Sequence, residues 1–403
     1  IARSEEQLHF IPGLSAHRVC DLPEGIVFGP LDSPFSCLLH RMGQSVAKAA
    51  AVLVNTFEGL DPTIDAVFSA SFSEYLHIGP LHLLVPPAGL TPDTHHCLPW
   101  LDRHAPATVA YVSFGSVMTP QPAELAALAE GLEASGAAFL WSLKDHAREL
   151  LPPGFLDRTK ERGLAVSWAP QLDVLRHAAV GAFVTHCGWN SVLEAMTAGV
   201  PMVCRPFFGD QRMNARSVSL AWKIGVEFEG GAITKEGVTR ALDTVLKGEE
   251  GKRLRVTACE LQAMTTRAVK EDADSVRGVG LVLDAASWRS AELNLPGRTS
   301  SRWGCGCWPW TMTGCASACS RPNSRTADTK VWVLLLRCCC GVVVVVVPRC
   351  VVGFYPRLGF ELQSWFRDSC FFCSLELWMV SRLLLALGTR KSRFERLRRN
   401  WFI

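Results

Sequence analysis

Short apolar runs alternate regularly with amphipathic stretches between Thr108 and Lys270 of this 403-residue chain. The apolar runs have the length of buried strands, and the stretches between them carry apolar residues at helical spacing. Strands that alternate with helices indicate a parallel sheet whose two faces are covered by helices. We therefore predict an α/β fold in which residues 105–272 form one Rossmann-like domain.

The remaining chain divides into three further parts. Residues 1–85 contain a strand at 49–55 and an amphipathic stretch at 35–42, and we assign them to an incomplete N-terminal domain. A passage rich in Pro and Gly follows, and we assign residues 86–104 to an interdomain linker. Residues 273–403 form a tail rich in Cys, Trp and Arg. We expect this tail to be irregular or disordered.

Charge separates the tail from the rest of the chain. The net charge of +3 combines −7 over residues 1–280 with +10 over residues 281–403. The tail also holds 10 of the 16 Cys and 8 of the 13 Trp, and residues 338–347 read CCCGVVVVVV. Homopolymer runs of this kind are what a short nucleotide repeat gives when it is translated. We interpret the tail as sequence that selection on a fold has not shaped.

Other interpretations of the tail are a disulfide domain, a metal site, a membrane anchor and a nucleic-acid patch. Its Cys lack paired CxxC ligand spacing, which disfavours zinc. The apolar run 331–352 is broken by Arg337 and Pro348-Arg349, so it is too short for a spanning helix of about 20 residues. The basic cluster 390–399 has no accompanying nucleic-acid-binding motif. We expect neither a membrane span nor a nucleic-acid partner.

The segment from Trp168 to Gln211 carries the functional information. It reads WAPQLDVLRHAAVGAFVTHCGWNSVLEAMTAGVPMVCRPFFGDQ, with polar groups at strand ends and helix starts. Such positions line the ligand crevice of an open α/β sheet. The dinucleotide fingerprint GxGxxG is missing. Instead, residues 185–191 follow a strand and open a helix, which collects free backbone N–H groups and the positive end of the helix dipole. This pattern predicts an anion site.

Each side chain of this segment also has an ordinary structural interpretation. Asn190 and Asp210 are common helix caps, and Glu194 is a common acid near a helix start. His186 is equally compatible with a satisfied polar group, and most Trp residues, such as Trp168, belong to cores. Only the joint spacing is specific.

That spacing resembles the plant secondary product glycosyltransferase box of the family 1 UDP-dependent glycosyltransferases. The resemblance implies a GT-B fold and a UDP-sugar donor, with no metal or other cofactor. It implies that Trp168 stacks on uracil, that the Ala169 backbone and Gln171 hold the base and ribose, and that Glu194 holds the ribose hydroxyls. It further implies two groups of contacts: to the diphosphate from Ser116, His186, Asn190 and Ser191, and to the sugar from Trp189, Asp210 and Gln211. Gln at the end of the box favours UDP-glucose.

Words outside the box, among them VNTFEGLDP, YVSFGSV and CRPFFGDQRMNARSV, resemble flavonoid and anthocyanidin 3-O-glucosyltransferases. The resemblance covers about Glu6 to Lys270. It implies a flavonoid-like acceptor and places Phe35 and Phe208 at acceptor-contacting positions, although either is also compatible with plain core. Two alternatives stay open: a transferase for another phenolic or terpenoid acceptor, and a non-catalytic UDP-sugar-binding fragment.

Family members deprotonate the acceptor with a His near the N-terminus that an Asp of the same domain orients. None of the eleven His falls in a matching motif, and the chain begins at Ile1 without an initiator Met. We therefore expect no catalytic base in this chain, and impaired inverting transfer. With no signal-like segment and six scattered Cys before residue 280, we expect a cytoplasmic monomer.

Overall fold

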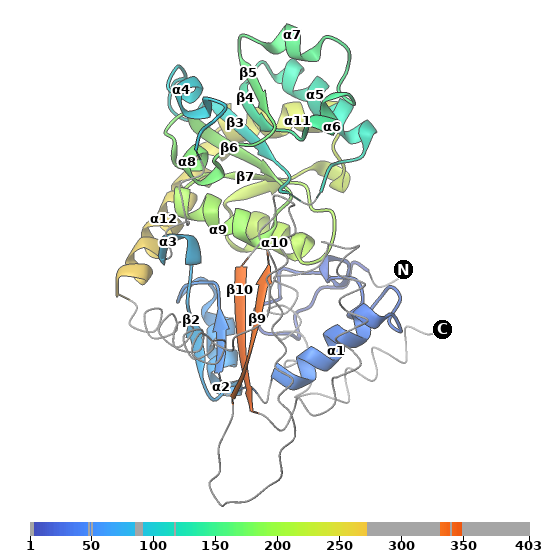
Figure 1. Ribbon diagram of the computed structural model, residues 1–403, viewed down its shortest axis with the longest axis vertical. Coiled ribbons are helices and arrows are strands. Elements are labelled where there is room, and N and C mark those ends of the chain that lie inside the picture. Colours follow the sequence, from blue (N-terminus) through green and yellow to red (C-terminus); the bar gives the residue numbers. More distant parts are fainter. Residues whose placement is uncertain are drawn as a thin grey trace, which may run out of the picture.

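The computed structural model describes residues 4–46, 49, 51–84, 92–116, 118–271, 331–338 and 341–348. Figure 1 shows an upper part built on a parallel sheet and a lower part that contains the first elements of the chain. Helices α9 and α10 lie where the two parts meet.

The upper sheet has six strands: β3 (Val109–Ser113), β4 (Ala138–Ser142), β5 (Gly163–Val166), β6 (Val180–Thr185), β7 (Met202–Cys204) and β8 (Gly225–Glu227). Neighbouring strands are all parallel, in the order β5-β4-β3-β6-β7-β8. Numbered within this domain, that order is 3-2-1-4-5-6, which is the order of a Rossmann fold. The predicted α/β fold is confirmed.

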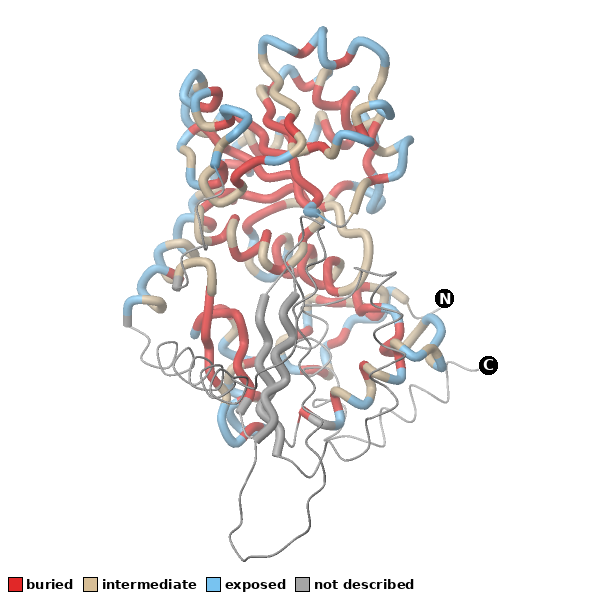
Figure 2. Tube along the Cα trace, viewed as in Figure 1, coloured by how far each residue is buried: buried red, intermediate tan, exposed pale blue. Residues whose placement is uncertain are grey.

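Side chains on β3 alternate between two hydrophobic clusters, one on each face of the sheet. Val109 and Tyr111 join one cluster, and Ala110 and Val112 join the other. This alternation follows from the two-residue period of a strand. Figure 2 shows the sheet as a buried layer between helices. A strand that is covered on both faces needs apolar residues at every position, which explains its continuous apolar run.

The helices of the upper part are α4 (Cys97–Leu101), α5 (Pro122–Ser135), α6 (Asp145–Arg148), α7 (Phe155–Thr159), α8 (Gln171–Arg176), α9 (Trp189–Ala198), α10 (Gln211–Arg216), α11 (Lys235–Leu242) and α12 (Glu249–Glu271). A 3-10 turn, η3 (Glu229–Gly231), precedes α11. Helices α10 and α11 continue as π-helices, η2 (Ser217–Ala221) and η4 (Asp243–Lys247). Helices α5 and α11 pack on one face of the sheet, whereas α9 and α12 pack on the other.

Most sequence-predicted elements of this domain agree with the structure within a few residues. Strand β8 was not predicted, because it has only three residues and begins with a glycine, so it carries no period. Helix α4 lies within residues 86–104, where we expected only a linker. Its Trp100 and Leu101 are buried in the core of the upper part. The domain boundaries remain a prediction.

The lower part contains η1 (Val19–Asp21), α1 (Pro34–Val46), β1 (Ala51–Val54), α2 (Pro62–Ser71), β2 (Tyr75–His77) and α3 (Leu81–Leu84). Strands β1 and β2 are parallel. Two segments of the tail, β9 (Val331–Cys338) and β10 (Gly341–Pro348), form an antiparallel hairpin whose β10 pairs with β1. These segments differ from the irregular tail that we expected, because valine favours strands. The rest of the tail lies outside the described residues.

Direct hydrogen bonds join the lower part to α9. The indole Nε1 of Trp189 donates to the backbone carbonyl of Asn55, at 2.8 Å. His82 Nε2 lies 2.8 Å from Thr197 Oγ1. The Asn55 side chain accepts from the backbone N–H of Leu81, at 2.9 Å, and its Nδ2 donates to Asn190 Oδ1, at 3.4 Å. Asn55 therefore fixes the end of β1 against the start of α9.

Replacing this amide tests its structural weight. Asn55→Ala leaves the buried N–H of Leu81 without its acceptor, so we expect the free energy of unfolding to fall by about 1–3 kcal/mol. Urea denaturation measures this change. As a control, Ser71→Ala removes an exposed hydroxyl that donates to Val67 O at 2.7 Å, and we expect a much smaller effect. Equal losses in both variants would contradict the role of Asn55.

Candidate functional site

The candidate site lies at the carboxyl ends of β3 and β6. These two strands are neighbours, and Ser113 pairs with Thr185 at their ends. The chain leaves β3 toward α5 on one face of the sheet and leaves β6 toward α9 on the other face. This arrangement is a topological switch point, where open α/β sheets bind ligands.

His186 lies directly after β6, in a slot between two glycines. A Cβ atom added to Gly188 would lie 2.4 Å from His186 Nε2, and one added to Gly115 would lie 2.9 Å from its Cε1. His186 Nδ1 is buried and has no hydrogen-bond partner among the described residues. Burial lowers the pKa of His186 to about 4, so the ring is neutral at pH 7. A neutral imidazole still has one N–H to donate to an anion.

The first turn of α9 begins beside this ring. Gly188 is the N-cap residue and makes no side-chain cap, so Asn190 stands inside the first turn and is not the cap. The first backbone N–H groups of a helix have no partner within the helix. Cys187 has a φ of 63°, an uncommon value for a residue with a side chain. The turn thus presents N–H groups and the helix dipole at the end of β6, as expected for an anion site.

A buried polar network lies beside this turn. Gln171 Nε2 donates to Glu194 Oε2 at 2.6 Å and to Ser191 Oγ at 3.2 Å. Tyr111 donates its hydroxyl to Gln171 Oε1 at 3.2 Å, which fixes the orientation of the amide. Burial raises the pKa of Glu194 to about 7, although the bond from Gln171 and the charge of Arg176 oppose the rise. Glu194 is therefore a carboxylate with unused capacity to accept hydrogen bonds.

Trp168 stands out by its exposure. Its residue surface is 55 % exposed, whereas its neighbour Ala169 is 3 % exposed. It follows β5 at the same edge of the sheet that carries the polar network. An exposed indole at a ligand-binding edge offers a flat surface on which a base can stack.

The start of α10 supplies a second acidic group. Asp210 occupies the N-cap position of α10, but its side chain makes no cap bond. Instead, its carboxylate accepts from Asn214 Nδ2 at 2.7 Å, and Asn214 also donates to the carbonyl of Cys187 at 2.9 Å. Burial raises the pKa of Asp210 to about 6. Gln211 Oε1 accepts from the backbone N–H groups of Phe207 and Phe208, at 2.9 and 3.3 Å.

The other candidate residues take varied places. Ser116 is exposed in the loop after β3. The Trp189 side chain is buried and bonded to Asn55, so the part of Trp189 that can face a ligand is its backbone N–H at the start of α9. Phe35 lies on α1, half-buried against the larger core cluster, and Phe208 lies half-buried in the turn before α10.

Three supporting residues escaped the sequence reasoning: Tyr111, Asn55 and Asn214. Tyr111 reads as one more apolar position of a strand, and Asn214 as one more polar position of a helix. Asn55 ends a strand, which is a weak sign of a site because parallel strands present their carboxyl ends to ligands. No group of metal-ligating side chains occurs within the described ranges, and none of the helices in those ranges is long and apolar enough to span a membrane.

Comparisons with known proteins agree with this geometry. Residues 35–261 match the family model described as UDP-glucoronosyl and UDP-glucosyl transferase. Anthocyanidin 3-O-glucosyltransferase 7 of Manihot esculenta is 53 % identical over 268 residues, covering 66 % of this chain and 93 % of that protein. An anthocyanidin 3-O-galactosyltransferase of Actinidia chinensis var. chinensis is 48 % identical over 281–290-residue-scale matches of this set, at 282 residues, covering 70 % of this chain and 62 % of that protein.

The structural comparison gives the same result. The crystal structure of a UDP-glucose: anthocyanidin 3-O-glucosyltransferase in complex with UDP superposes with a TM-score of 0.65 and 40 % sequence identity. The match covers 71 % of this chain and 64 % of that chain, so the present chain spans about two thirds of the solved protein. The fold is that of the GT-B glycosyltransferases. The chain belongs to the family of UDP-dependent glycosyltransferases, closest in kind to those that act on flavonoid and anthocyanidin 3-hydroxyls.

Proposed function

We propose that the upper part of this protein binds UDP-glucose, and that the whole protein transfers the glucose to the 3-hydroxyl of a flavonoid with inversion. The observation that carries the donor proposal is the grouping of Trp168, the Gln171–Glu194 pair and the first turn of α9 along one sheet edge. These groups match the base, ribose and diphosphate of a nucleotide in that order. No metal takes part, because the helix N-terminus and His186 supply the donors that the diphosphate needs.

Glucose rests on a narrower argument than UDP. Relatives of similar identity use different sugars, since one is named a glucosyltransferase and the other a galactosyltransferase. Overall similarity therefore does not select the sugar. We assign glucose because Gln211 ends the box, at the start of α10. Binding of UDP-glucose and UDP-galactose, measured side by side by calorimetry, tests the assignment. Tighter binding of UDP-galactose would contradict it.

The acceptor half of the proposal concerns the lower part. We place a flavonoid near Phe35 and Phe208, with a phenol or terpenoid as the alternative acceptor. We also propose that this chain binds the donor but transfers slowly. His186 is too weak a base at a pKa of about 4, and Glu194 is assigned to the ribose. Incubation with UDP-glucose and a flavonol tests this: a normal rate of glucoside formation would contradict the impairment, and no donor binding would contradict the function itself. The scattered free cysteines suit action in the cytosol, as a monomer.

Trp168→Ala gives a direct test of the nucleotide site. Loss of base stacking costs about 1–3 kcal/mol, so we expect the Kd for UDP to rise about tenfold or more. Because the side chain is largely exposed, we expect the Tm to stay unchanged. Leu156→Ala is the matched control, since Leu156 is 38 % exposed and lies on α7, away from the polar network. Unchanged UDP affinity in Trp168→Ala would contradict the stacking role.

A further inference from the structure

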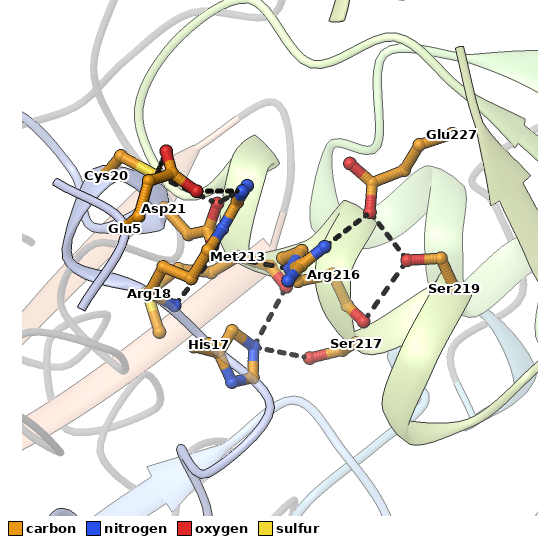
Figure 3. A network of polar contacts seen from close by, with 10 residues as sticks. All are labelled: Glu5, His17, Arg18, Cys20, Asp21, Met213, Arg216, Ser217, Ser219 and Glu227. Carbon is orange, nitrogen blue, oxygen red and sulfur yellow. Dashed lines mark hydrogen bonds and ion pairs between the residues drawn. The ribbon is translucent and has the colours of Figure 1, made fainter. Parts of the chain in front are cut away.

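A polar network joins the first 21 residues of the chain to α10 and η2, the helical segment that begins with the proposed sugar-binding residues. Figure 3 shows this network, with residues of the N-terminal segment on one side and Met213, Arg216 and Ser217 on the other. Its partners lie about 200 positions apart in sequence, with separations of 196 and 200 for the two contacts of His17.

His17 holds the junction between α10 and η2. Its Nε2 lies 3.1 Å from the carbonyl oxygen of Met213 and 3.0 Å from Ser217 Oγ, and the residue is 2 % exposed. A carbonyl oxygen only accepts hydrogen bonds, so Nε2 carries the proton. The junction is where the helix changes from α to π, and His17 binds the carbonyl at that change.

Asp21 holds the same segment through charge. Its carboxylate accepts from Arg18 Nε and NH2, at 3.2 and 2.9 Å, and forms an ion pair with Arg216 Nε at 3.4 Å. Asp21 is 3 % exposed, so this carboxylate is buried between two guanidinium groups. On the far side, Ser219 donates to Glu227 of β8 at 2.6 Å, which ties η2 to the sheet.

These contacts leave α10 little freedom to move. Helix α10 has six residues, about 9 Å of axis, so a displacement at Met213 or Arg216 is transmitted to Asp210 and Gln211 at its start. The base and ribose residues, by contrast, lie on β5, α8 and α9 and make no printed contact with this network. A change in the network is thus expected to act on the sugar and to spare the nucleotide.

We propose that His17, Asp21 and Arg216 are positioning residues for the donor sugar: they fix α10 so that Asp210 and Gln211 meet the hexose hydroxyls. The inference rests on the proposed binding of UDP-glucose. It makes the N-terminal segment part of the sugar selectivity of a site that lies in the other half of the molecule.

The test compares two ligands in the full chain by calorimetry. In Asp21→Asn, we expect the Kd for UDP-glucose to rise about tenfold, while the Kd for UDP changes by less than about twofold. The preference for UDP-glucose over UDP-galactose is expected to narrow. The matched control is Arg240→Gln, which breaks an exposed ion pair with Glu229 on α11, and we expect neither Kd to change.

A second pair of variants guards against misfolding. His17→Gln keeps a donor for the Met213 carbonyl and is expected to retain UDP-glucose affinity, whereas His17→Leu removes the donor and is expected to lose it. Equal weakening of UDP and UDP-glucose, or no change in either, would overturn the inference. If the unaltered chain binds neither ligand, the proposed function fails and the inference falls with it.

Discussion

Glu194→Gln is expected to weaken UDP binding about a hundredfold and, at pH 8, to make the ligand-free protein more stable. The carboxylate is proposed to accept two ribose hydroxyls, and hydrogen bonds to a charged group contribute about 1.5–3 kcal/mol. An amide of the same shape keeps one acceptor, so the bond from Gln171 survives and the fold is preserved. The loss of affinity then reflects the missing charge.

The gain in stability follows from the raised pKa of Glu194. Burial raises it from 4.5 to about 7 in the folded protein, so the folded state holds the proton more tightly than the unfolded state does. The stability from this proton is full below pH 4.5 and is lost as the pH rises through about 7. The loss amounts to about 3 kcal/mol at most. Glutamine does not ionise, so the variant escapes it.

Urea denaturation of both proteins at pH 5 and pH 8 measures the effect. The variant is expected to be more stable than the unaltered protein at pH 8 by about 2 kcal/mol, with the difference shrinking toward pH 5. Glu130→Gln, at an exposed position of α5, serves as the control and is expected to change neither stability nor UDP affinity. A loss of stability at pH 8 in Glu194→Gln would refute the argument from burial.

The sequence predicted the sheet well because its signals are local. A continuous apolar run such as that of β6, or the helical spacing of α5, depends on residues that are neighbours in the chain. The polar groups of the box were also placed correctly at the carboxyl edge, because each one directly follows a strand or begins a helix.

Long-range contacts were beyond the same reasoning. Nothing near His17 signals that it binds the carbonyl of Met213, and nothing near Asn55 signals that its carbonyl receives the indole of Trp189. Such contacts arise only once separate elements are packed together, and a single polar residue has no period to reveal them. The change from α10 to a π-helix likewise depends on packing.

Gly188→Ala is expected to weaken UDP binding by roughly thirtyfold, through the loss of about 2 kcal/mol in hydrogen bonding to the diphosphate. The backbone of Gly188, at φ −60° and ψ 140°, suits alanine, so the substitution adds no backbone strain. Its methyl group, however, would lie 2.4 Å from His186 Nε2 and 3.1 Å from Cε1. Gly115 closes the other side of the slot, so the ring has to leave its position.

A comparison of ligands separates this effect from general damage. Uridine lacks phosphates, so its affinity is expected to be the same in Gly188→Ala as in the unaltered protein, while UDP affinity falls. A double-mutant cycle with His186→Ala then identifies the route of the effect. If the methyl group acts by displacing the ring, Gly188→Ala has little further effect once the ring is gone. Additive losses would instead mean that the methyl group blocks the phosphate itself, and His186 would lose its assigned role.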